Sequence, residues 1–235
     1  MPPARRALES AAAPLAGATA GLFAALSAAR RKRVFHPDGT AFEGSVTFGV
    51  NRDLPFHGIE RALVRLSRGI GLPEKAPDIL GLAIKLPDLD HDFLFATSGE
   101  GALTRHLLVP AGGYFRRPYS SVLPYEVNGK LVVFGARADA FLAGAPDGEL
   151  EDLEALVERG RVRFDLTWGP AGRGEIATLG SLELRTTYDG DLAFNPFNTY
   201  GAVRPAGALN RLRRESYGAS QRARPDTEHV ATAST

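Results

Sequence analysis

The alternation of apolar and polar side chains along the chain predicts mainly β-strands. In residues 42–50 the large apolar side chains share one parity, residues 162–168 alternate strictly, and residues 176–188 are predicted to form one long strand or two short ones. Two dense apolar runs of strand length, residues 79–86 and 93–97, predict buried strands that pair through the polar segment between them.

The dipeptide Asn128-Gly129 predicts a hairpin turn, because both residues tolerate the positive φ angles of a type I′ turn. It separates two apolar runs, residues 122–127 and 131–136, which we expect to pair as antiparallel neighbours. The patterns together predict about seven or eight strands in one domain.

Helical spacing of apolar residues predicts a short helix over residues 58–68. Ile59, Leu63 and Leu66 have this spacing, and the helix is expected to end at the breaker Gly69.

A second internal helix is predicted to begin at Asp147 as its N-cap and to end at Gly160. Its apolar stripe consists of Leu150, Leu153, Leu156 and Val157. The acidic residues of the segment are interpreted as its solvated face; they are Asp147, Glu149, Glu151, Asp152 and Glu154.

Both ends of the chain are also predicted to be helical. Residues 1–32 contain an uncharged Ala-rich stretch with too few large apolar residues for a bilayer core, so we expect a helix that packs on the body of the protein. Residues 206–224 are expected to form a basic helix, and residues 225–235 a disordered tail.

Composition narrows the function classes. The chain has 235 residues, 44% hydrophobic and 23% charged, as in a single folded domain. Its net charge of +1 gives no general attraction to nucleic acid or anionic membranes. The absence of cysteine excludes disulfides, Cys-ligated zinc, iron–sulfur clusters and a thiolate-ligated haem. We expect no membrane span and, by default, a cytoplasmic location.

One stripe of the predicted C-terminal helix is chemically suited to haem binding. Arg213, Tyr217 and Arg224 share this stripe, with Ser220 or Gln221 between the last two. A guanidinium beside a phenol favours the phenolate, which can ligate ferric haem. The spacing alone also fits a solvated basic face.

Four sequence elements give this stripe a wider context. They are Arg33-Val34-Phe35-His36 with the glycine-containing segment that follows, Arg65-Leu66-Ser67, the run Asp-Ile-Leu-Gly-Leu-Ala-Ile-Lys-Leu at residues 78–86, and residues 194–222, which begin Phe-Asn-Pro-Phe-Asn and include Arg213-Arg214-Glu215-Ser216-Tyr217. In this order they resemble the distal-histidine strand, the Arg-Phe-Ser element, the Asp-Pro-Arg-Gly-Phe-Ala-x-Lys-Phe strand and the proximal-haem helix of the catalase superfamily. The resemblance is strongest to the small catalase-related haem proteins of bacteria.

The resemblance implies an α+β fold, a catalase-like antiparallel β-barrel of about eight strands with flanking helices. Residues 33–224 would then form the haem-binding barrel domain, with residues 1–32 as a helix packed on it. The implied cofactor is haem b, with its iron.

The resemblance also implies roles for single residues. His36 resembles the distal histidine, the base in O–O cleavage, and Ser67 resembles its hydrogen-bonding partner. Tyr217 resembles the proximal phenolate ligand of the iron, and Arg213 the guanidinium that keeps it ionised.

Further residues resemble those that hold the haem itself. Arg33, Arg65 and Arg224 resemble the propionate-binding arginines, for which bidentate hydrogen bonds are suited. Phe35 would lie over the haem and narrow the distal pocket.

The sequence departs from the catalase pattern at the distal asparagine. Alignment of Phe93-Leu94-Phe95 with the aromatic pair of the family places Asp90, His91 or Asp92 at this position, and His91 or Asp92 is a candidate for a weak substitute. The chain is also shorter than a full catalase, which implies a more open haem site. Both departures favour peroxidase chemistry on organic hydroperoxides over disproportionation of hydrogen peroxide.

The sequence therefore predicts a catalase-related haem peroxidase or hydroperoxide-cleaving enzyme. Its partners would be hydrogen peroxide or an organic hydroperoxide and a small reductant, and assembly as a homodimer is an open alternative. Two other functions are compatible with the residues. One is a fatty hydroperoxide isomerase or dehydratase on the same scaffold, and the other is a non-catalytic barrel that carries haem or another apolar ligand.

Overall fold

The structure is a computed structural model, and it describes residues 39–69, 76–142, 145, 150–160 and 162–206. Ten strands and four short helices occur in this part of the chain. The strands are β1 (Gly39–Phe48), β2 (Ile59–Arg68), β3 (Leu80–Leu86), β4 (His91–Thr97), β5 (Tyr119–Ser120), β6 (Tyr125–Val127), β7 (Lys130–Ala138), β8 (Arg163–Pro170), β9 (Ala177–Thr187) and β10 (Arg204–Pro205). The helices are η1 (Pro87–Leu89), η2 (Thr104–His106), η3 (Ala140–Leu142) and α2 (Leu150–Glu158).

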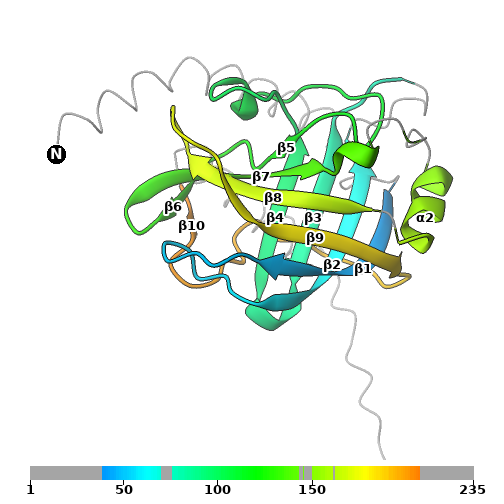
Figure 1. Cartoon of the computed structure of the whole chain (residues 1–235), viewed down its shortest axis with the longest axis horizontal. Helices are drawn as coiled ribbons and strands as arrows, with labels where there is room; N and C mark the ends of the chain where they lie inside the picture. The colour runs from blue at the N-terminus through cyan, green and yellow to red at the C-terminus, as the bar shows by residue number, and fades with distance from the viewer. Residues whose placement is uncertain (1–38, 70–75, 143–144, 146–149, 161, 207–235) are drawn as a thin grey trace, which may run out of the picture.

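The strands form one antiparallel sheet that closes on itself. Its order is β10-β6-β7-β5-β4-β3-β2-β1-β9-β8, and an additional pairing of β7 with β8 closes a barrel of eight strands. β6 and β10 extend the sheet beyond β7, at the opposite end of the molecule from α2 (Figure 1). This architecture confirms the predicted antiparallel β-barrel of about eight strands.

Aromatic rings fill the interior of the barrel. Phe56 stacks on Phe48 with ring centroids 5.1 Å apart and lies 5.4 Å from Phe93, and Phe93 lies 5.3 Å from Phe134. All four side chains are buried. Aromatic side chains bury large apolar areas, so this cluster is a major source of barrel stability.

The segment 58–68 is a strand, and the prediction of a helix there is wrong. β2 pairs along its length with β1 and β3, and Val64 lies between Phe42 of β1 and Ile84 of β3. Ala62, Val64 and Leu66 are fully buried in the barrel interior. Apolar residues on both faces of this strand mimic helical spacing, and pairing on both edges overrides that local signal.

The hairpin prediction is confirmed. Asn128 and Gly129 have φ angles of 49° and 78° and join β6 to β7. β6 is shorter than the run predicted for it, because Val122 has a φ of 60° and its N–H donates to the Ser120 hydroxyl at 2.9 Å. This local turn ends the extended conformation before residue 125.

Helix α2 confirms the predicted apolar stripe where it is described. Leu153, Leu156 and Val157 are buried, and Gly160, with a φ of 63°, ends the helix by donating its N–H to the Val157 carbonyl. The proposed N-cap, Asp147, lies outside the described residues, as do the predicted terminal helices and the tail. No helix in the described part of the chain is long and apolar enough to cross a membrane.

Candidate functional site

Two of the eight predicted site residues, Arg65 and Ser67, lie in the described part of the chain. Both belong to β2. The other six lie outside the described residues; they are Arg33, Phe35, His36, Arg213, Tyr217 and Arg224.

Arg65 and Ser67 share the outer face of the barrel. They alternate with Val64 and Leu66, whose side chains are fully buried in the interior. Ser67 pairs directly with Gly81 of β3. Arg65 pairs with Ala83, two residues further along the same two strands and on the same face. The pairing therefore brings two of the sequence elements, Arg65-Leu66-Ser67 and the strand that includes Gly81, together on one face.

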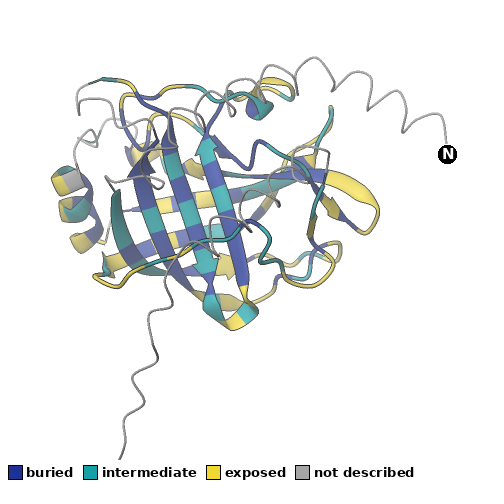
Figure 2. Ribbon diagram, turned by 180° about the vertical axis from the view of Figure 1, so that it is seen from behind, coloured by how far each residue is buried: buried dark blue, intermediate teal, exposed yellow. Residues whose placement is uncertain are grey.

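A row of small residues crosses this outer face through direct strand pairing. Its members, none larger than threonine, are Gly39, Ser67, Gly81, Ala96, Ser120, Gly135 and Thr167. Figure 2 shows the barrel from behind, with buried and intermediate bands alternating along several of its strands. The row leaves this level of the wall without large side chains.

The described residues fit a flat group with anionic arms, as haem would require. A planar macrocycle would require a local patch without large side chains, which Ser67, Gly81 and Ala96 supply on the neighbouring strands β2, β3 and β4. Carboxylate arms would require guanidinium groups, and Arg65 carries one on the same face. Among the described residues there is no group of three or more metal-ligating side chains. The resemblance assigns the iron ligand to Tyr217, which lies outside the described residues.

The start of β4, where the catalase pattern has a distal amide, is already bonded within the protein. Asp92 is 1% exposed and accepts hydrogen bonds from Lys85 Nζ at 2.8 and 3.0 Å. Its Oδ2 also accepts the Asn195 N–H at 2.7 Å. Burial raises the pKa of Asp92, and the bonds from Lys85 and Asn195 oppose that rise.

His91 points into the barrel, on the opposite face of the sheet from Arg65 and Ser67. The side chain is fully buried, and its ring contacts Phe56 and Phe93 with centroid distances of 5.0 and 4.2 Å. Nδ1 accepts the Tyr200 N–H at 3.0 Å. Burial lowers the pKa of His91 to about 3, so the imidazole is neutral at physiological pH.

Residues 194–200, here called the strap, are hydrogen-bonded to the start of β4. These contacts were not predicted from the sequence. Residues far apart in the sequence make the contacts, so no local pattern could have shown them. A signal was nevertheless present, since Lys85 and Asn195 both lie in motifs that resemble the catalase family. Lys85 Nζ lies 5.6 Å from the ring centroid of Phe194, which adds a cation–π contact to its ion pair.

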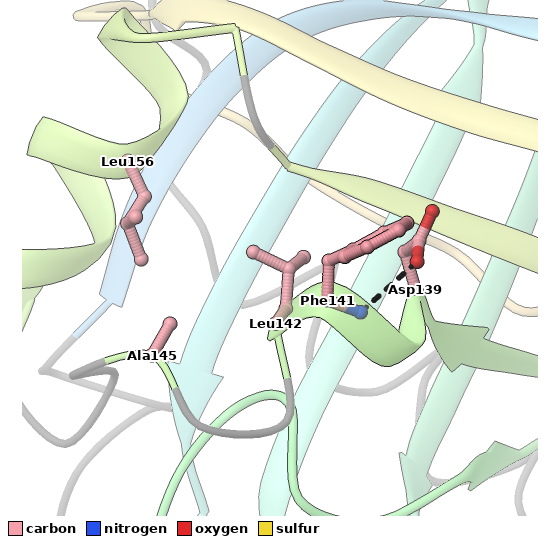
Figure 3. A pocket seen from close by; sticks show the side chains of 5 residues that line it. All are labelled: Asp139, Phe141, Leu142, Ala145 and Leu156. Atoms are coloured by element: carbon pink, nitrogen blue, oxygen red, sulfur yellow. Dashed lines mark hydrogen bonds between the residues drawn. The ribbon is translucent and has the colours of Figure 1, made fainter.

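A separate pocket of about 380 Å³ lies between η3 and α2 (Figure 3). It is lined by Asp139, Phe141, Leu142, Ala145 and Leu156. Neither Arg65 nor Ser67 lines it, and Asp139 Oδ1 accepts the Phe141 N–H at 3.1 Å within the η3 turn. The pocket is therefore distinct from the candidate site.

Comparison with solved structures places the fold among catalases. The chain is similar to a fungal catalase, with a TM-score of 0.61 and 15% identity, to catalase A from Saccharomyces cerevisiae, with 0.61 and 12%, and to a bacterial catalase, with 0.59 and 14%. Each match covers 86% of this chain and 60% to 63% of the catalase, so the chain spans less than two thirds of their length.

No protein-family model matches the chain, and no curated protein matches it significantly. The comparisons thus establish a catalase-like barrel fold.

Proposed function

We propose that this protein is a haem-dependent peroxidase or hydroperoxide-cleaving enzyme of the catalase-related type. The observation that carries the proposal is the position of Arg65, Ser67 and Gly81 on one outer face of a catalase-like barrel. The motifs around His36 and Tyr217 support it from the segments that flank the barrel in sequence.

In this proposal residues 33–224 form the haem domain, residues 1–32 a helix packed on the barrel, and residues 225–235 a tail. The small residues Ser67, Gly81 and Ala96 would face haem b, Tyr217 would be the iron ligand, and Arg213 would keep its phenol ionised. The propionates are held by Arg33, Arg65 and Arg224, while Phe35 narrows the distal side.

When bound, haem supplies the redox chemistry that breaks the O–O bond of a hydroperoxide. His36 takes the proton of the bound hydroperoxide and returns it to the departing oxygen, which leaves as water or an alcohol. The Ser67 hydroxyl hydrogen-bonds to the imidazole and fixes its orientation. A small reductant from solution then provides the electrons that complete a peroxidase cycle.

The start of β4 favours organic hydroperoxides over hydrogen peroxide as substrates. Asp92 is the outward-facing residue there, and its carboxylate is engaged by Lys85 and Asn195. It therefore supplies no free amide to position a small peroxide for disproportionation. The same feature favours a second candidate, isomerisation or dehydration of a fatty hydroperoxide, because a rearrangement requires neither a second peroxide nor a reductant.

Product analysis of the haem-loaded protein tests the proposal. Hydrogen peroxide, cumene hydroperoxide and a fatty acid hydroperoxide are each supplied with and without an aromatic reductant. We expect oxidised reductant with the organic hydroperoxides and little oxygen release from hydrogen peroxide. An allene oxide or its hydrolysis products without reductant would select the second candidate. Inertness toward all three substrates with haem bound would contradict enzymatic function.

Replacement of the proposed distal base gives a sharper test. His36→Ala is expected to keep the haem absorption of the wild type and to lower the rate of O–O cleavage by about 100-fold or more. Stopped-flow absorption after addition of cumene hydroperoxide measures that rate. An unchanged rate would remove His36 from the mechanism.

A further inference from the structure

The strap is bonded to three consecutive residues at the junction of η1 and β4. Asp92 accepts the Asn195 N–H at 2.7 Å and donates its own N–H to the Asn198 carbonyl at 3.1 Å. Asn198 Nδ2 reaches Asp90 Oδ1 at 3.4 Å, and Tyr200 donates its N–H to His91 Nδ1 at 3.0 Å. The Asn195 end of the strap is thus bound by the Asp92 carboxylate on the outer face of β4, and the Tyr200 end is bound by the His91 imidazole on the inner face.

The strap also holds its own shape. Asn195 Oδ1 accepts the Phe197 N–H at 3.0 Å, and Asn195 Nδ2 donates to Asn198 Oδ1 at 3.0 Å. The Asn198 N–H returns to the Asn195 carbonyl at 2.9 Å. These bonds close a turn within the strap.

The bond to the strap explains why a histidine occupies position 91, because it is the one polar interaction of the His91 side chain among the described residues. Nδ1 accepts a backbone N–H, so Nε2 carries the proton, and this buried Nε2–H has no hydrogen-bond partner among the described residues. A phenylalanine would fit the surrounding aromatic interior at lower cost. The acceptor at Nδ1 is the feature that a phenylalanine could not supply.

Beyond the strap the chain is fixed to the barrel again. Val203 is fully buried in the core, Arg204 and Pro205 pair with β6, and Ala206 donates its N–H to the Pro124 carbonyl at 2.9 Å. Ala206 is the last described residue before the segment that contains Tyr217. The strap and β10 therefore fix the described chain against the barrel as far as Ala206.

We propose that His91 and Asp92 are positioning residues that clamp the strap to β4, and that haem binding depends on this clamp because it fixes the chain against the barrel as far as Ala206. The inference rests on the proposed function for the haem, whereas the clamp itself rests on the contacts above. Neither residue acts on substrate. Both lie in the segment Asp90 to Asp92, which the resemblance aligns with the distal amide of catalases.

The first test removes the acceptor and then restores it. His91→Phe keeps the ring volume and deletes Nδ1, while His91→Asn offers an amide oxygen close to the Nδ1 position. Phe95→Leu, in the same strand and facing the same interior, is the matched control, because it loosens the core and leaves the hydrogen bonds between the strap and β4 in place. Asn195→Ala, which opens the strap turn without altering the barrel core, is a second variant in case His91→Phe fails to fold.

Amide hydrogen exchange of residues 195–200, measured without added haem, reports directly whether the strap stays bonded to β4. We expect exchange of the Tyr200 amide to be about tenfold faster or more in His91→Phe or Asn195→Ala, and near wild type in His91→Asn and Phe95→Leu. Unchanged exchange in both His91→Phe and Asn195→Ala would overturn the clamp.

Haem titration, followed by absorption, measures how loosening the strap changes the affinity of the protein for haem. We expect a dissociation constant about tenfold higher or more in the two loosened variants and close to wild type in the other two. Faster exchange with unchanged haem affinity would overturn the positioning role. A wild-type protein that takes up no haem would overturn the proposed function and this role together, while the exchange data would still decide the clamp.

Discussion

At the scale of single residues, a buried neutral histidine is the clearest electrostatic feature of the protein. His91 lies inside an aromatic cluster, and burial lowers its pKa to about 3 from an ordinary value of 6.5. The unfolded chain therefore binds a proton at a pH where the folded chain does not. This difference links folding stability to pH through one side chain.

The linkage has a definite sign. Because the folded pKa is depressed, the contribution of His91 to stability is fully present above pH 6.5 and is lost as the pH falls toward about 3. We expect wild type to lose up to roughly 1.4 kcal/mol of unfolding free energy per pH unit in this window from this group. His91→Asn has no titrating group there, so its stability should decline less steeply. Urea unfolding at pH 7, 5 and 4 measures both slopes, and parallel profiles would contradict the assignment.

At the scale of elements, glycine decides how closely β1 and β9 can approach. A Cβ on Gly44 would collide with the Glu183 carbonyl of β9, and a Cβ on Gly180 would collide with the Thr47 carbonyl of β1. The register also shifts between Glu43 and Gly44. The two glycines therefore permit the pairing that closes this side of the barrel.

Substitution of one of these glycines is expected to be costly. Gly44→Ala should lower the free energy of unfolding by about 2 kcal/mol or more, because the carbonyl that it meets is backbone and cannot move alone. Gly49→Ala is the control, since its Cβ would lie 3.6 Å from the Leu179 carbonyl, an ordinary contact. Chemical denaturation compares the two variants. Equal stabilities would show that the strands separate without penalty.

Local patterns predicted the elements whose signals are local. The alternation in β8 and the turn residues Asn128 and Gly129 act through their own backbone, and the structure agrees with both. β2 was predicted wrongly because its outer face carries the apolar residues Ile59 and Leu63, of which Leu63 is buried, and these interrupt the alternation of apolar and polar positions. Such burial depends on what covers the strand and cannot be read from the strand alone.

The candidate site likewise combines residues that the sequence identified with neighbours that only the structure could show. The resemblance selected Arg65 and Ser67 from sequence, and the strand register then placed Gly81 and Ala83 beside them. Register cannot be deduced from the pattern of one strand, because pairing partners come from the neighbouring strand. The clamp of the strap on Asp92 joins residues 103 positions apart, beyond the reach of any local rule.

At the scale of the whole molecule, the closed barrel assembles a surface that no single strand contains. Seven strands each contribute one small residue to the row that includes Ser67 and Gly81. The fold is shared with catalases, although this chain spans less than two thirds of their length. We infer that the barrel wall is the platform for the haem and that the flanking segments complete the site.

The most direct measurement of this account is the absorption spectrum of the haem-reconstituted protein and of Tyr217→Phe. The account predicts that wild type gives a Soret band and high-spin ferric features of tyrosinate ligation, and that Tyr217→Phe loses haem or changes to another spectrum. Tyr200→Phe is the control, because it removes a described tyrosine hydroxyl and leaves the backbone bond to His91 in place. A tyrosinate spectrum retained in Tyr217→Phe, or no Soret band in wild type, would contradict the central claim.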